Sequence, residues 1–326
     1  MDAAQSPTDA APSATVRKPL WKRVLQFPLT ALIIAVVIMV IAQALAAGAS
    51  ALAGTPTGDL ASPLDAVFSV AVTVLMVLAY KLLVVRLGER PRDDLPFDGR
   101  ARDAATGFGA GVVLFSAIVG VAALIGVYRA LGLSPARDWL PILLGTGLMA
   151  GVTEEILLRG IVFRWLEELG GSWVALALSA LLFGFLHAAN PNATVVSSLS
   201  IALAAGVLLG GAYMLTRNLW LAIGLHAGWN VTQGLVWDVP ISGFALDGWV
   251  ESRLVGDPLW SGGPFGLEAS VITMVLATAA GVGLIWLAAR RGHLMRNWWS
   301  RRRAAAGSDE AVGIDVDRDP HPLGKA

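Results

Sequence analysis

The sequence has no cysteine, and only 15% of its 326 residues are Asp, Glu, Lys or Arg. The absence of cysteine excludes disulfide bonds and thiol chemistry. Soluble domains carry roughly 25% charged residues, so this chain does not have the composition of an ordinary soluble domain. Its 24 basic and 24 acidic residues cancel to a formal net charge of zero. Because no basic field results, we expect no nucleic-acid partner.

Hydrophobic residues make up 56% of the chain, and they form runs that reach or exceed the roughly 20 residues needed to cross a bilayer. The sequence therefore predicts an all-α, polytopic membrane bundle of about eight transmembrane helices. The first apolar run is too long for a signal peptide, so we expect an uncleaved anchor. The predicted spans are about 28–53, 64–87, 105–128, 139–165, 172–189, 194–216, 219–238 and 268–290.

The spans suggest an organisation around one core. Polar residues without periodicity at both ends of the chain are typical of disordered tails. The long external loop contains tryptophans and glycines, and it can either cap the bundle or contact a substrate. The predicted parts are a tail at 1–16, accessory helices 1–3 in 17–138, core helices 4–7 in 139–238, the external loop 239–267, helix 8 with a basic end in 268–303, and a tail at 304–326.

Lys and Arg are unevenly distributed among the predicted loops. They cluster before the first span, between the second and third spans, and after the eighth, whereas the opposite side holds only Arg129, Arg137 and Arg253. The positive-inside rule then predicts that both termini face the cytoplasm, and we expect the protein in the cell (inner) membrane. Five tryptophans near span ends are typical of an aromatic belt: Trp139, Trp165, Trp173, Trp220 and Trp237.

Two glycine patterns have a structural interpretation. Gly206 and Gly210 form a small-xxx-small face on the sixth span, which allows a neighbouring helix to approach closely. The stretch "GFGAG" at 107–111 is not interpreted as a phosphate-binding loop, because no strand precedes it.

Ionisable residues occur within three of the predicted spans. Glu154, Glu155 and Arg159 lie in the fourth span, His187 ends the fifth, and His226 lies in the seventh. An ionisable group in mid-bilayer costs about 2.5–3.5 kcal/mol on insertion scales. Five such groups on three helices therefore predict one shared polar cavity.

The spacing of these residues indicates their roles. Glu155 and Arg159 are separated by four positions with the acid first, which favours an ion pair on one helix face. Glu154 lies about 100° around the helix, and it is the carboxylate left free for chemistry. His226 and Asn230 are also four positions apart, so both can project towards one point.

This combination of side chains suits hydrolysis in a desolvated pocket. Glu154 and His187 can hold and deprotonate a water molecule, because burial makes a glutamate a better base. His226 and Asn230 can donate hydrogen bonds to the oxyanion of a tetrahedral intermediate. Phe183 shares a helix face with His187, so its ring can pack beside the imidazole.

Three short motifs resemble those of a known family. "EEILLR", "FGFLH" and "HAGWN" match the EExxxR, FxxxH and HxxxN motifs of the CPBP family, the CAAX-protease and bacteriocin-processing (ABI) intramembrane endopeptidases. All three motifs occur in family order on successive predicted spans within 139–238. Each motif alone is weak, but the ordered set is specific.

The resemblance implies an intramembrane endopeptidase that hydrolyses peptide bonds of membrane-associated proteins or peptides in the lipid bilayer. The best-known members remove the last three residues from prenylated CAAX proteins. Nothing in the motifs identifies the substrate or the oligomeric state. Carried over by position, Glu154 and His187 activate water, His226 and Asn230 form the oxyanion hole, and Glu155, Arg159 and Phe183 support them.

The cofactor and the function each leave alternatives. Glu154, His187 and His226 can serve as three zinc ligands, but HExxH is absent and the sequence reveals no carboxylate partner for either histidine. We therefore favour a mechanism without a metal. A proton-coupled transporter is an alternative, although no inverted repeat is found, and so is a non-catalytic membrane scaffold of the same fold. No serine-protease turn or pair of intramembrane aspartates is present.

One feature conflicts with a shared site. Counting about 1.5 Å per residue from the cytoplasmic helix ends places His226 nearer the cytoplasm than His187. Helix tilt, or a deep position of the turn at 168–172, is required to bring the two histidines together.

Overall fold

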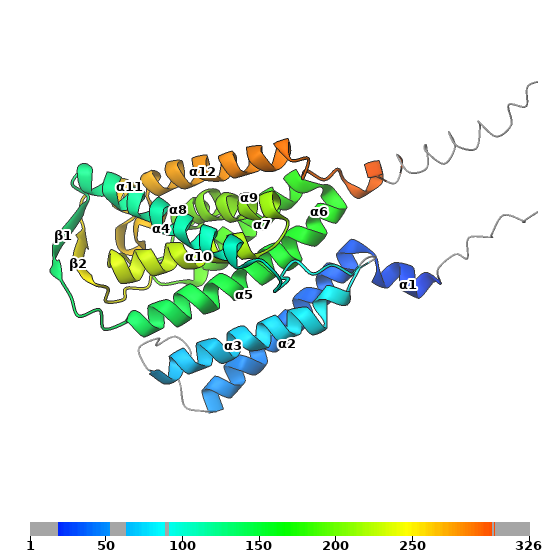
Figure 1. The fold of residues 1–326 in the computed structure, drawn as a ribbon. Helices are drawn as coiled ribbons and strands as arrows, with labels where there is room; N and C mark the ends of the chain where they lie inside the picture. Colours follow the sequence, from blue (N-terminus) through cyan, green and yellow to red (C-terminus); the bar gives the residue numbers. More distant parts are fainter. Residues whose placement is uncertain (1–18, 53–62, 89–90, 302, 304–326) are drawn as a thin grey trace, which may run out of the picture.

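The structure is a computed structural model that describes residues 19–52, 63–88, 91–301 and 303. It is a bundle of long helices with a small two-stranded sheet at one end (Figure 1). The predicted tails, 1–16 and 304–326, lie outside the described residues.

The described chain contains seven helical segments that are long and apolar enough to cross a membrane. They correspond to seven of the predicted spans, and the protein is therefore a multi-pass integral membrane protein. The remaining predicted span, 219–238, is also helical, but it consists of only a 12-residue helix and a 5-residue extension. The seven segments are Pro28–Ala49, Ala66–Arg86, Ala101–Leu124, Pro141–Gly170, Ser172–Ala189, Val195–Thr216 and Val271–Arg290.

The secondary structure changes in character along the chain. The first part contains α1 (Leu20–Leu25), α2 (Pro28–Leu52), α3 (Pro63–Leu82), the 3-10 turn η1 (Val84–Arg86), α4 (Ala101–Leu124) and strand β1 (Tyr128–Leu133). The second part, the long fourth span with the fifth and sixth, contains η2 (Pro141–Ala150), α5 (Gly151–Glu155), η3 (Ile156–Phe163), α6 (Arg164–Gly170), α7 (Ser172–Leu186), η4 (His187–Ala189), α8 (Val195–Ile201), η5 (Ala202–Gly206) and α9 (Val207–Thr216). The last part contains α10 (Trp220–Val231), η6 (Thr232–Val236), β2 (Val250–Leu254), α11 (Pro258–Ser261), η7 (Gly263–Phe265), η8 (Leu267–Ala269) and α12 (Val271–Arg290).

Four of these segments, η2, η3, η5 and η6, are π-helical. π-Helical turns are rare and often occur at functional sites. Here η2 and η3 flank α5, which carries the glutamate pair, and η6 directly follows α10. The wide turns therefore gather around the helices that carry the polar motifs.

The sheet was not predicted from the sequence. β1 pairs antiparallel with β2, with Tyr128 opposite Leu254 and a shift in register between Ala130 and Gly132. The strands are short and lie in the two loops at one end of the bundle (Figure 1), where neither forms an apolar run. The predicted external loop is therefore a folded cap that contains a strand and short helices.

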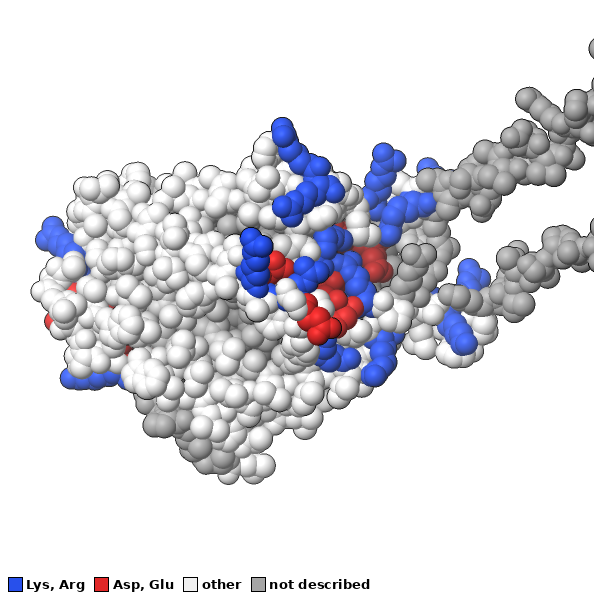
Figure 2. All heavy atoms as spheres, viewed as in Figure 1, with Lys and Arg blue, Asp and Glu red and all other residues white. Residues whose placement is uncertain are grey.

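Charged side chains gather at the opposite end of the molecule, where α1 and the segment after α12 also lie, and the surface between is almost uncharged on the face in Figure 2. Part of this charge is buried. Arg92 forms an ion pair with Asp94 at 2.6 Å, and the hydroxyl of Tyr213 donates to the same carboxylate at 3.2 Å. Burial raises the pKa of Asp94, while Arg92 opposes this shift. The cluster fastens the loop before α4 to α9.

One tryptophan departs from the predicted aromatic belt. Trp139 and Trp173 are exposed, whereas Trp165 is only 1% exposed and belongs to the core. The belt interpretation of Trp165 is wrong because the helix does not end there. The fourth span continues to Gly170, which places Trp165 inside the protein.

The predicted glycine face on the sixth span is confirmed. A β-carbon at Gly206 would lie 2.7 Å from the β-carbon of Ala180, and one at Gly210 would lie 2.6 Å from the side chain of Leu176. Both contacts are with α7. The absence of side chains at these positions therefore allows α7 to pack closely against η5 and α9.

A second and closer glycine contact joins α4 to α10. Gly107 and Gly111 of the "GFGAG" stretch lie against the backbone of α10, and Gly224 and Gly228 of α10 lie against the backbone of α4. A β-carbon at any of these four positions would collide with a backbone atom of the other helix. Two small-xxx-small faces therefore interlock, and they hold the helix that carries His226.

We expect Gly111→Ala to lower the melting temperature of the purified protein by several degrees, because the methyl group requires the two helices to separate. Gly109→Ala is the matched control: it lies in the same helix, and a β-carbon there meets nothing within 4 Å. Thermal unfolding in detergent measures both variants. Equal melting temperatures would contradict the interlocked packing.

Candidate active site

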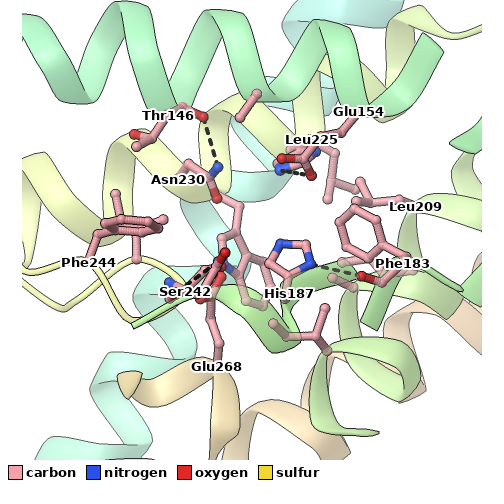
Figure 3. Close-up of a pocket in the computed structure, with 18 residues that line it drawn as sticks. Thr146, Glu154, Phe183, His187, Leu209, Leu225, Asn230, Ser242, Phe244 and Glu268 are labelled. Carbon is pink, nitrogen blue, oxygen red and sulfur yellow. Dashed lines mark hydrogen bonds and ion pairs between the residues drawn. The ribbon is translucent and has the colours of Figure 1, made fainter. Parts of the chain in front are cut away.

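The predicted polar residues meet at one pocket inside the bundle (Figure 3). Glu154 of α5, His187 at the end of α7, and His226 and Asn230 of α10 all line this cavity. Its volume is about 110 Å³, and a single water needs only about 10–15 Å³ measured in this way. The cavity is therefore large enough for water together with part of a substrate.

The predicted ion pair lies behind the pocket wall. Arg159 donates to Glu155 at 2.8 Å, and both side chains are fully buried. The guanidinium group also donates to the carbonyl of Gly206 at 3.2 Å and lies over the ring of Phe183, 4.7 Å from its centroid. Arg159 therefore links η3 to η5 and α7 while it neutralises Glu155.

Glu155 has a second partner that the sequence did not reveal. Its carboxylate accepts a hydrogen bond from Nδ1 of His226 at 3.0 Å. The inference that neither histidine has a carboxylate partner is therefore wrong. The two residues are 71 positions apart, and only the packing of α5 against α10 brings them together. Glu155 thus fixes the orientation of the imidazole ring.

Glu154 lies on the other side of the same ring. Its Oε2 atom is 4.0 Å from Nε2 of His226, which is too long for a direct hydrogen bond and suitable for a bridging water. Oε2 is buried and has no hydrogen-bond partner among the described residues. The carboxylate is therefore available to a molecule in the pocket, as its divergence from Arg159 predicts.

The hydrogen bond of His187 determines which of its nitrogens faces the pocket. Nδ1 lies 2.8 Å from the carbonyl oxygen of Phe183. A carbonyl can only accept, so Nδ1 carries the proton, and Nε2 of the neutral ring keeps its lone pair. Figure 3 shows this second nitrogen directed into the open space. The ring of Phe183 packs against His187 with centroids 4.9 Å apart, as the shared helix face predicts.

Asn230 is held by the first turns of the fourth span. Its Nδ2 donates to the carbonyl of Thr146 at 2.8 Å, which leaves the second N–H of the amide available to the pocket. Thr146 itself donates to the carbonyl of Ile142 in the preceding turn. The amide therefore has a fixed orientation beside His226.

The conflict in depth between the two histidines is resolved by the turn between α6 and α7. Arg217, just before α10, forms a bidentate ion pair with Glu167, at 2.9 and 2.6 Å. Glu167 precedes the turn at Gly171, so this turn extends beyond the beginning of α10. Because α7 begins further out, His187 can lie deep in its sequence and still reach the pocket of His226.

Several pocket residues were not predicted. The cap supplies Ile241, Ser242 and Phe244, and the segment before α12 supplies Glu268. The only sequence signal for Glu268 was an acidic residue at the first position of a predicted span. That position suggests a helix end at the membrane surface, so it attracted no functional interpretation. The predicted external loop therefore contributes one wall of the pocket.

The residues do not form a metal site in this structure. Among the part of the chain that the structure describes, no three His, Cys, Asp or Glu side chains lie where they could hold a metal ion. Glu154, His187 and His226, the alternative zinc ligands, are therefore not arranged as a ligand set.

The comparison with known proteins agrees with this site. The fold and the pocket define a multi-pass membrane protein of an intramembrane protease family. A family model described as type II CAAX prenyl endopeptidase Rce1-like matches residues 136–232, which include Glu154, His187 and Asn230. The chain therefore contains a domain of the Rce1-like, or CPBP, family at these residues. No curated protein and no solved structure matches the chain.

Proposed function

We propose that this protein is an endopeptidase that hydrolyses peptide bonds of membrane-associated proteins or peptides, as the CAAX prenyl proteases do. The observation that carries the proposal is the convergence of a free carboxylate, two histidines and an amide on one cavity, from α5, α7 and α10. These are the groups that peptide hydrolysis without a nucleophilic side chain requires.

In the proposed reaction, a water molecule binds between Glu154 and Nε2 of His187. Glu154 takes one proton from this water while the oxygen attacks the carbonyl carbon of the substrate. The tetrahedral intermediate then collapses, the C–N bond breaks, and the proton passes from Glu154 to the leaving amine. The products are a carboxylic acid and an amine, and the enzyme returns to its initial state.

His226 and Asn230 are the proposed donors to the oxyanion. Asn230 offers the amide N–H that Thr146 leaves free. Because Nδ1 of His226 donates to Glu155, Nε2 can donate only from the doubly protonated ring. Carboxylates on both sides of the ring favour this cation, which would then stabilise the negative oxygen of the intermediate.

The orientation of the protein is part of the proposal. Both described ends of the chain lie at the charged end of the bundle (Figures 1 and 2), and the basic residues there favour the cytoplasmic side. We therefore propose that the protein lies in the cell membrane with both termini in the cytoplasm and receives its substrate from the membrane.

Replacement of Asn230 tests the oxyanion role. We expect Asn230→Ala to lower kcat by about 10²–10³-fold, as the loss of one oxyanion donor does in other hydrolases, with little change in KM. The measurement is cleavage of fluorogenic peptides by the protein reconstituted in lipid nanodiscs. Asn297→Ala, in the segment after α12 and outside the pocket, is the control. A change in KM alone would remove Asn230 from the transition state.

A further inference from the structure

We propose that Glu268 determines substrate specificity: its carboxylate forms a subsite for a positively charged group, such as a Lys or Arg side chain, close to the scissile bond. This inference rests on the proposed endopeptidase function and adds the substrate class. Glu268 lies outside the matched family domain at residues 136–232, so the family's motifs do not include it.

The position of Glu268 supports such a role. Its side chain lines the same cavity as Glu154, and the two carboxylates lie on opposite sides of the open space in Figure 3, with His187 between them. A peptide bound at Glu154 and His187 would therefore extend along the wall that Glu268 forms. Contact between a substrate side chain and this carboxylate requires no movement of a helix.

The hydrogen bonds of Glu268 leave its charge uncompensated. Oε2 accepts from the backbone N–H of Ser242 at 2.6 Å and from the Ser242 hydroxyl at 2.9 Å. Oε1 accepts only a long bond of 3.3 Å from Nε1 of Trp229, and that N–H is shared with Gln233 at 2.8 Å. All of these donors are neutral, and Oε1 keeps acceptor capacity.

No cation in the described part of the chain forms an ion pair with Glu268. The residue is nevertheless only 8% exposed, and buried carboxylates are normally paired with a positive charge. No Lys or Arg lines the pocket, because Arg159 lies behind Phe183 and is bound to Glu155. A positive group of the substrate would supply the missing partner, whereas an acidic group would be repelled.

The neutral donors also explain how this carboxylate is held in place. Ser242 belongs to the turn 240–244, and this turn is fixed on its other side by Asn190, whose Nδ2 donates to the Ser242 carbonyl at 3.1 Å. Phe244 of the same turn lines the pocket beside it. The subsite therefore combines a fixed charge with an aromatic wall, which suits the apolar stem and charged head of a long basic side chain.

The experiment compares peptides that differ at one position. A series is made with Lys, Gln or Glu at each of the three positions on either side of the cleaved bond. Binding is measured with the Glu154→Gln protein, and cleavage with the protein that retains Glu154. Each measurement is repeated with Glu268→Gln, which keeps a hydrogen-bond acceptor of the same size and removes the charge.

With Glu268 present, we expect the Lys peptide to bind about tenfold more tightly than the Gln peptide at one position, and the Glu peptide to bind more weakly. Glu268→Gln should abolish this order, and Glu268→Lys should reverse it. Equal preferences before and after the Glu268→Gln substitution would overturn the proposal, as would a uniform loss of binding with a lower melting temperature, which indicates a structural role only. Because binding is measured without hydrolysis, absence of cleavage would overturn the proposed function without obscuring the test of the subsite.

Discussion

Replacing Glu154 by Gln is expected to lower kcat by about 10²–10⁴-fold, the contribution typical of a positioned general base. Gln has nearly the same size and can still accept a hydrogen bond, but it cannot take a proton from water. The melting temperature should change little, because Glu154 is one-third exposed and does not form the ion pair with Arg159. Loss of activity with retention of fold is the specific signature of the proposed role.

The measurement combines single-turnover cleavage in nanodiscs with thermal unfolding of the same preparations. Glu251→Gln is the control, since Glu251 is an exposed carboxylate on β2 far along the chain from the pocket residues of α5. Turnover by Glu154→Gln equal to that of the unchanged protein would remove Glu154 from the mechanism. A lower melting temperature with proportional loss of activity would instead assign Glu154 a structural role.

Replacing Arg159 by Met is expected to have the opposite signature. Breaking a buried ion pair by removal of one partner typically costs about 3–5 kcal/mol, because the remaining charge stays in a medium of low dielectric constant. Here Glu155 is fully buried, and its other partner in the structure, His226, would have to compensate alone. We therefore expect a large decrease in folded yield and melting temperature, greater than that of Glu154→Gln.

A double variant separates charge from packing. In Glu155→Gln combined with Arg159→Met, no unpaired charge is left, so we expect a higher melting temperature than for Arg159→Met alone. The amide oxygen that Glu155→Gln introduces can still accept from Nδ1 of His226. Arg253→Met, at an exposed position of β2, is the control for the substitution itself. Equal melting temperatures for Arg159→Met and Glu154→Gln would contradict the buried-pair interpretation.

The local parts of the site were predictable because they follow from helix geometry. Four-residue spacing gave the pair Glu155–Arg159 and the contact between Phe183 and His187, and both are present. The same spacing placed Gly206 on a face for helix contact. Such contacts lie within one or two turns of a single helix, so the order of residues is sufficient to predict them.

Contacts between helices were predicted in kind but not in detail. The cost of charge in the membrane predicted that the ionisable residues would share a cavity, and they line one pocket. The sequence did not predict that Glu155 would hold His226 or that Gly111 and Gly228 would interlock α4 with α10. These contacts depend on the crossing angle and rotation of two helices, which no spacing within one helix specifies.

The sequence by itself determined the membrane location, the number and approximate limits of the helices, and the identity of the polar residues, because each follows from hydrophobicity or from helical period. Only the tertiary structure decided that the cap, through Ser242 and Glu268, forms a wall of the pocket. It also determined that the turn before α7 lies beyond the start of α10, which brings His187 and His226 to one cavity. The physical reason is that these features are set by packing between segments distant in the chain, where the positions of many side chains act together.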